Sequence, residues 1–335
     1  MSAAVVRLLR RPEAAVALAI AALAIGIGLA NPRFWEAANL LGLLRANVVP
    51  GVMALGVLLV LISGGIDVSF PAFAAAAMYL TVRAMLDLGV DSVAFALLMA
   101  AGIGAAFGAV NALFVREMRI VPLIVTLGTG AVARGFLLGV VGTSVVNIGQ
   151  MPPSLLAFGR AELAAVEAAD GSRAALPATV LIYLGLALAV HLLLTRTLLG
   201  RGVHATGGDA QAAERAGFDL RATTYAVYAL AGALAGLAGL LHASMAWLAS
   251  PREFIGLELD VLAAVVLGGA SIFGGRGSVV GTMLGVSLLV LVSNSLILVG
   301  VPTTWQRVVV GTVLIAATAA TALRERRATA AASPA

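Results

Sequence analysis

The sequence predicts an all-α polytopic membrane protein with about ten transmembrane helices and both termini in the cytoplasm. Hydrophobic residues make up 61% of the 335-residue chain and charged residues only 11%, and the mean hydropathy is +1.06. A soluble domain carries about 25% charged residues, so this chain cannot cover a water-facing surface and needs lipid as its solvent. Its apolar runs are continuous rather than alternating, which favours helices over a β-barrel.

The length limits the number of crossings. Each crossing takes about 20 apolar residues, so ten crossings with short loops leave no room for a large soluble domain. We therefore predict a single transmembrane domain over residues 1–335, with these crossings: 14–30, 48–63, 71–88, 92–115, 122–142, 177–195, 223–247, 259–273, 278–298 and 304–322.

Two segments near the N-terminus need separate interpretation. The basic start followed by an apolar run resembles a signal peptide, but no small-residue cleavage site follows. We interpret residues 14–30 as the first transmembrane helix. Residues 34–47 carry Trp35 and Arg45 among leucines, which predicts an interfacial helix rather than a crossing.

The arginines set the predicted orientation. With a cytoplasmic N-terminus, the inside segments hold 13 arginines and the outside segments hold 5, as the positive-inside rule expects. Two long loops follow from this topology. The loop at about 143–176 faces the periplasm and has room for a short helix, and the loop at about 196–222 faces the cytoplasm.

Glycines recur in two patterns. Gly104 with Gly108, and Gly232 with Gly236, are small residues four apart within apolar runs, which indicates close helix packing in lipid. Glycine doublets at 64–65, 268–269 and 274–275 fall instead at the ends of predicted crossings beside polar residues. Such doublets are typical of helices that break to line a cavity.

The residue inventory excludes several chemistries. The chain has no cysteine, which excludes disulfides and cysteine-based metal sites. All 21 basic residues are arginine. A phosphate-binding P-loop needs a lysine, so any ATP hydrolysis must reside on another polypeptide.

Two charged residues stand out against the apolar background. Asp67 lies in Ser-Gly-Gly-Ile-Asp-Val-Ser, residues 63–69, between two apolar stretches. A carboxylate there is costly and usually functional, although a cytoplasmic turn that happens to hold Asp explains the pattern equally well. Arg134 lies within a crossing and must face the protein interior or water. We predict that Asp67 and Arg134 both lie within the protein, away from lipid. Arg134 either pairs with Asp67, snorkels to the interface, or forms a buried ion pair that holds helices together.

Five sequence blocks along the chain, taken together, resemble those of a known protein family. The blocks are residues 63–69, 122–134, 207–217, 256–277 (with Glu-Leu-Asp and two Gly-Gly doublets ending in Gly-Gly-Arg-Gly) and 304–307. In this order and spacing they resemble the permeases of ribose-, arabinose-, xylose- and galactose-type bacterial ABC importers. The resemblance covers about residues 35–322, and branched-chain amino-acid permeases are more distant relatives.

The resemblance implies an ABC importer permease fold in the bacterial inner membrane, working by alternating access on a monosaccharide or simple polyol. It implies a second permease subunit (homo- or heterodimer), a cytoplasmic ABC ATPase and a periplasmic sugar-binding protein. No nucleic-acid partner, cofactor, metal or catalytic residue is expected. The candidate residues for the translocation path or cavity are Asp67, Ser69, Asn111, Thr126, Thr129 and Arg134.

The cytoplasmic loop resembles the coupling loop of importer permeases, which reads Glu-Ala-Ala-x3-Gly. Here Gln211 replaces the Glu, and Ala212, Ala213 and Gly217 follow. The segment after Gly207-Gly208 predicts a short helix with Asp209 at its N-cap and Gly217 at its end. Gln211, Ala212 and Ala213 are expected to offer a slim face that lies in a groove of the ATPase.

One departure from the family concerns the substrate. Phe70-Pro71 stands where many sugar permeases have a small residue and Gly. This leaves the local cavity shape and the identity of the sugar open.

Alternative functions remain at this stage. An ABC permease for branched-chain amino acids or nucleosides is one, and an ion-coupled carrier is another, although such carriers usually place more carboxylates within their crossings. His204 and Asp209 match the His-x4-Asp pattern of acyltransferases, but no second catalytic block accompanies them. His191 and His242 are isolated on apolar helices, so the sequence predicts no metal cluster.

Overall fold

The computed structural model describes residues 12–167 and 173–298, together with positions 300, 305, 308, 311 and 312. The order of elements is α2 (Pro12–Ala30), η1 (Pro32–Trp35), α3 (Ala37–Ala46), α4 (Val48–Ile62), α5 (Phe70–Leu88), α6 (Val93–Arg116), α7 (Pro122–Phe136), η2 (Leu137–Val141), α8 (Pro153–Arg160), β1 (Glu162–Glu167), β2 (Arg173–Pro177), α9 (Thr179–Arg196), α10 (Leu198–Gly208), α11 (Ala210–Arg215), α12 (Leu220–Ala246), α13 (Leu257–Leu267) and α14 (Val279–Leu298).

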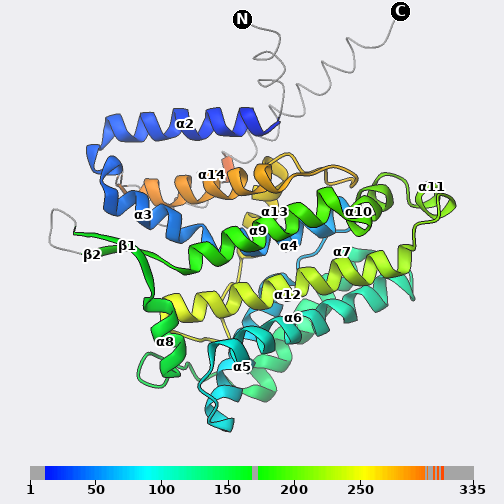
Figure 1. The fold of residues 1–335 in the computed structure, drawn as a ribbon, viewed down its shortest axis with the longest axis horizontal. Coiled ribbons are helices and arrows are strands. Elements are labelled where there is room, and N and C mark those ends of the chain that lie inside the picture. Colours follow the sequence, from blue (N-terminus) through cyan, green and yellow to red (C-terminus); the bar gives the residue numbers. More distant parts are fainter. Residues whose placement is uncertain are drawn as a thin grey trace, which may run out of the picture.

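The long helices lie roughly side by side, so the bundle has two ends (Figure 1). Helices α10 and α11 lie at one end, which we call the α11 end. Helix α8 and the β1–β2 hairpin lie at the other, which we call the α8 end. Helix α12 runs between them and reaches both.

Helix α4 forms the centre of the core. Its sequence, VVPGVMALGVLLVLI, has no charged or strongly polar side chain, and 13 of its 15 residues are buried. A helix that is apolar on every side is stable only when other helices surround it. Helices α9, α12, α13 and α14 pack around α4.

Glycines allow a close backbone contact between α6 and α12. A Cβ atom added to Gly104 would lie 2.0 Å from the carbonyl oxygen of Gly232, and one added to Gly232 would lie 2.1 Å from that of Gly104. At Gly108 and Gly236 the opposing backbones of Tyr228 and Ala100 are equally close. The predicted packing role of these small residues is confirmed.

Among the described residues, six helical stretches are long and apolar enough to cross a membrane: Glu13–Ala30, Ala37–Ile62, Val93–Arg116, Pro122–Val141, Thr179–Arg196 and Leu220–Ala246. The chain is thus a largely helical polytopic membrane protein. The crossing predicted at 304–322 lies almost entirely outside the described residues.

Two predicted elements differ from the structure. Residues 37–46 do form a helix, but it continues into α4, and the two make one apolar stretch of 26 residues rather than a separate interfacial segment. The crossing predicted at 259–273 is helical only as far as Leu267, the last of the 11 residues of α13, because the chain leaves the helix at Gly268 and turns at Gly269, whose φ is +95°. At 1.5 Å per residue, α13 is about 16 Å long and too short to cross alone.

The loop predicted at 143–176 holds the expected short helix, α8. It also holds an antiparallel hairpin of β1 and β2 that the sequence analysis did not anticipate. Alanines and charged residues dominate both strands, and neither shows the β-branched, alternating pattern that signals a strand.

Candidate functional site

Four of the six candidate path residues form one chain of hydrogen bonds near the start of α5. The Asp67 carboxylate accepts from the Ser69 backbone nitrogen at 2.7 Å and from the Ser69 hydroxyl at 2.5 Å. Asn111 of α6 donates to the same hydroxyl at 2.9 Å, and Thr129 of α7 donates to Asn111 Oδ1 at 2.6 Å. We call Asp67, Ser69, Asn111 and Thr129 the polar network. It joins the 63–69 loop to two neighbouring helices.

The Thr126 side chain forms hydrogen bonds to the backbone of the same loop. Its hydroxyl donates to the Ile66 carbonyl at 3.2 Å and lies 3.3 Å from the Val68 nitrogen, which donates to it. Thr126 is fully buried, and Asp67 is only 3% exposed. The prediction that Asp67 lies within the protein is confirmed. The network fixes the loop in place, with Asp67, Ser69 and Asn111 buried and Thr129 partly exposed.

Arg134 does not join this network, so of the three alternatives left open for it the structure favours an ion pair between helices over pairing with Asp67. Its partner is Glu258 in the first turn of α13, 3.5 Å away, and the two side chains are 21% and 27% exposed. One terminal nitrogen of Arg134 is buried without a hydrogen-bond partner in the described part of the chain. The sequence could not predict this ion pair, because its two residues are far apart along the chain and come together only when the bundle folds.

The predicted coupling helix is present as α11. The Asp209 side chain accepts from the Ala212 nitrogen at 3.0 Å, which is the expected N-cap. Gly217 has φ +87°, and the Phe218 nitrogen donates to the Ala213 carbonyl at 3.1 Å. These are the features of a Schellman end, so local sequence defines both ends of this helix.

The exposed face of α11 is not the one that the sequence analysis expected. Ala213 is 4% exposed and packs against the protein body, whereas Gln211 and Ala212 are exposed. A partner that docks on α11 therefore meets Gln211 and Ala212, and Ala213 anchors the helix from behind.

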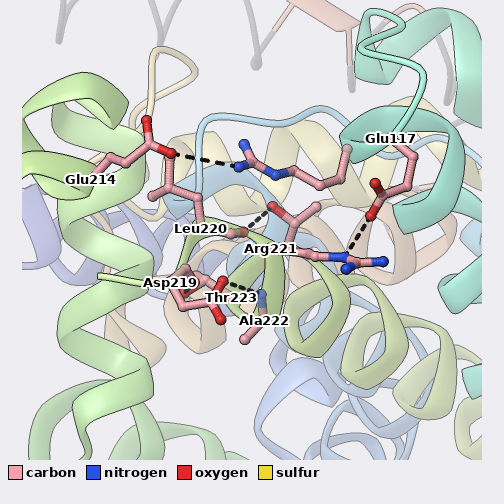
Figure 2. A network of polar contacts seen from close by, with 9 residues as sticks. Glu117, Glu214, Asp219, Leu220, Arg221, Ala222 and Thr223 are labelled. Carbon is pink, nitrogen blue, oxygen red and sulfur yellow. Dashed lines mark hydrogen bonds and ion pairs between the residues drawn. The ribbon is translucent and has the colours of Figure 1, made fainter. Parts of the chain in front are cut away.

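Two ion pairs lie close to α11 (Figure 2). Glu117, after α6, accepts from Arg221 of α12 at 2.7 Å, and Arg116 lies 3.9 Å from Glu214 of α11. Their side chains are between 36% and 67% exposed, so each pair contributes little stability. They do connect three segments of the α11 end: the α6 terminus, α11 and the start of α12.

Three glycine-rich segments meet beside α11, at what we call the glycine junction. The Gly275 nitrogen donates to the Ile62 carbonyl at 2.8 Å. A Cβ atom added to Gly207 would lie 1.8 Å from that carbonyl oxygen, and one added to Gly274 would lie 2.9 Å from the Gly64 Cα. The junction therefore joins α10 to the end of α4 and to the loop before α14. The sequence showed these glycines but could not show that they touch.

His204 and Asp209 both make contacts within their own segment of the chain. His204 Nδ1 lies 2.9 Å from the Gly200 carbonyl, and the Asp209 carboxylate caps α11, so both members of the His-x4-Asp pattern serve local structure. No group of three potential metal ligands occurs among the residues that were searched.

Residues 39–318 match the protein family described as branched-chain amino acid transport system, permease component. The chain belongs to this permease family. It is therefore a transport subunit of the ABC importer type and a multi-pass inner-membrane protein, not an enzyme. Among solved structures, none matches the chain.

Relatives within the family resemble the chain over nearly its full length. The ribose import permease protein RbsC of Bacillus subtilis is 36% identical over 88% of each chain. That of Escherichia coli K12 is 34% identical over 86% of each. The D-allose transport system permease protein AlsC of Escherichia coli K12 is 31% identical over 84% of this chain and 82% of its own.

Proposed function

We propose that this permease imports a neutral monosaccharide from the periplasm to the cytoplasm by alternating access. The observation that carries the proposal is the set of sugar importer permeases that match over more than four-fifths of both chains. A branched-chain amino acid is the competing substrate, because the family description names it.

We propose further that the chain crosses the membrane ten times with both termini in the cytoplasm, and that it works as a pair of permease subunits. The short helix α13 makes its crossing together with the segments on either side of it, which reach the α8 end and the glycine junction. The excess of arginine in the predicted inside segments supports this orientation. With it, the α11 end faces the cytoplasm and the α8 end faces the periplasm and its sugar-binding protein.

ATP hydrolysis then resides on a separate ATPase that docks on α11. The absence of lysine supports this division, since a P-loop needs one. The exposure of Gln211 and Ala212 supports the place of docking, and the glycine junction offers a route for movement of α11 to reach the 63–69 loop. We place Asp67, Ser69, Asn111, Thr126, Thr129 and Arg134 in the part of the permease that opens and closes the path.

Uptake by the purified complex in proteoliposomes tests this function. With the ATPase and binding protein present, we expect ATP-dependent uptake of at least one of ribose, allose, xylose or galactose, and no uptake of leucine. Leucine uptake in place of sugar uptake overturns the substrate. Sugar uptake by the permease alone, driven by a proton or sodium gradient, overturns the importer mechanism.

A variant of α11 tests the docking proposal. Ala212→Trp places a large ring on the exposed face, and we expect ATPase activity that sugar and binding protein no longer stimulate, in a complex that still inserts into the membrane. His204→Ala is the control, because its ring only bonds within α10. Normal uptake by Ala212→Trp excludes this face as the docking site.

A further inference from the structure

A cavity of about 520 Å³ lies at the α8 end, and neither the sequence motifs nor the family assigns it a role. The C-terminal turns of α3 and α12 line it, together with the first turn of α4 and the segment that leads into α13. Small-molecule sites typically measure roughly 300–1,000 Å³ and combine an apolar wall with a few polar groups. The cavity has this composition.

Three polar side chains from three segments meet at the cavity. Glu253 and His242 approach to 3.5 Å, with 28% and 26% of their side chains exposed. His242 also stacks edge-on against Phe254, with ring centroids 4.9 Å apart. Arg45 donates to the Met245 carbonyl at 2.8 Å, and this uses only part of its five N–H donors.

The depth of the cavity in the membrane follows from the length of α12. Its 27 residues span about 40 Å, so its ends extend past a hydrocarbon core of about 30 Å. His242 lies four residues, or about 6 Å, before the end of α12, close to the membrane surface. Charged groups at this level need water or a polar ligand around them. The cavity therefore lies close to the membrane surface at the α8 end.

A second pair of charged residues begins one position after the cavity along the chain. Leu257 lines the cavity, and the next residue, Glu258, pairs with Arg134 of α7. Arg134 lies 12 residues from the start of α7, or about 18 Å along it, which is near mid-membrane. Helix α13 starts here after a loop in which Gly256 has φ +89°. Short, broken helices of this kind line substrate paths in transporters.

We propose that this cavity is the entry site for the sugar, where Arg45, His242 and Glu253 bind its hydroxyl groups. The proposal rests on the proposed function as a monosaccharide importer. Sugar hydroxyls both donate and accept hydrogen bonds, and the cavity offers guanidinium donors, a carboxylate acceptor and an imidazole. The charges of Arg45 and Glu253 cancel, so the site favours a neutral sugar over a sugar acid or a sugar phosphate.

The absence of cysteine in the native chain allows a direct test. Ala46→Cys places a thiol in the cavity wall, and Ala164→Cys places one on the exposed surface of the hairpin as a matched control. The assembled complex is treated with a charged, membrane-impermeant thiol reagent. We expect labelling of both variants, and protection of Ala46→Cys alone by the sugar that the complex imports. An equal concentration of gluconate should not protect.

If sugar uptake stays intact, any of three results overturns the entry site. The first is that Ala46→Cys resists labelling although Ala164→Cys is labelled. The second is that the imported sugar fails to protect Ala46→Cys from labelling, and the third is that the binding protein protects it without any sugar. Failure of the complex that contains the native chain to import any sugar instead removes the proposed function itself, so the two failures are distinguishable.

A second variant separates sugar binding from structural support. For Glu253→Gln we expect the KM of uptake to rise about five-fold, the loss of one hydrogen bond, with little change in the maximal rate. Glu167→Gln on the hairpin is the control and should leave both constants unchanged. A fall in maximal rate at unchanged KM assigns Glu253 a structural role and overturns its part in the site.

Discussion

Asp67 illustrates how one buried carboxylate organises its surroundings. It is 3% exposed, and its oxygen accepts two hydrogen bonds from Ser69, whose hydroxyl also accepts from Asn111. Each donor or acceptor in such a network has been removed from water and depends on its partner. Removal of one member leaves the others unsatisfied, which costs about 1–3 kcal/mol for each neutral group.

We therefore expect Asp67→Ala to lower the thermal unfolding midpoint of the purified permease in detergent by several degrees. Asp67→Asn retains an acceptor oxygen for the Ser69 nitrogen and hydroxyl, and its midpoint should fall less. A scan of intrinsic fluorescence against temperature measures both variants beside the native chain. Equal stability of Asp67→Ala and the native chain would show that the network is not needed for the fold.

At the scale of the helices, two glycines differ in what surrounds them. Gly104 of α6 lies against the backbone of α12, whereas Gly135 of α7 has nothing within 4 Å of an added Cβ. The two have the same local conformation and different surroundings. An alanine substitution at each position therefore separates two effects: the higher helix propensity of alanine and the lack of space for its methyl group.

We expect Gly104→Ala to destabilise the permease by about 1–3 kcal/mol, because α6 and α12 must move apart to admit a methyl group. Gly135→Ala should be neutral or slightly stabilising, since alanine favours helix by up to about 1 kcal/mol over glycine. The fraction that remains monodisperse after heating, measured by size-exclusion chromatography, compares the two. A similar loss in both variants would contradict the packing role assigned to Gly104.

At the scale of the whole molecule, the glycine junction connects α10 and α11 to the bundle. Gly207 lies against the Ile62 carbonyl and the Gly275 nitrogen, which are hydrogen-bonded to each other. A Cβ atom added to its neighbour Gly208 would have nothing within 4 Å. Movement of α11 can pass through this junction to α4 and to the 63–69 loop that follows it.

We expect Gly207→Ala to reduce ATP-driven uptake about ten-fold, because the added methyl group would disrupt the hydrogen bond between Gly275 and Ile62 and strain the junction by about 1–3 kcal/mol. Gly208→Ala in the same helix should transport normally. Uptake and ATPase activity are measured on the same reconstituted complexes. Normal uptake by Gly207→Ala would show that the junction does not transmit the movement.

The sequence by itself determined the features that depend on local pattern. Continuous apolar runs identified the helices, and the order of motifs identified the permease family. Asp209 and Gly217 defined both ends of α11, because a helix cap involves residues only a few positions apart. The small residues four apart in α6 and α12 indicated a packing face, though not which helix each would meet.

Only the tertiary structure decided which distant residues meet. Arg134 pairs with Glu258, 124 positions along the chain, and not with Asp67. Ala213 faces the protein body and not the partner, and the glycines near 64, 207 and 274 converge. The physical reason is common to all three. A residue type and its neighbours restrict the local conformation, whereas contacts between distant segments depend on how whole helices pack.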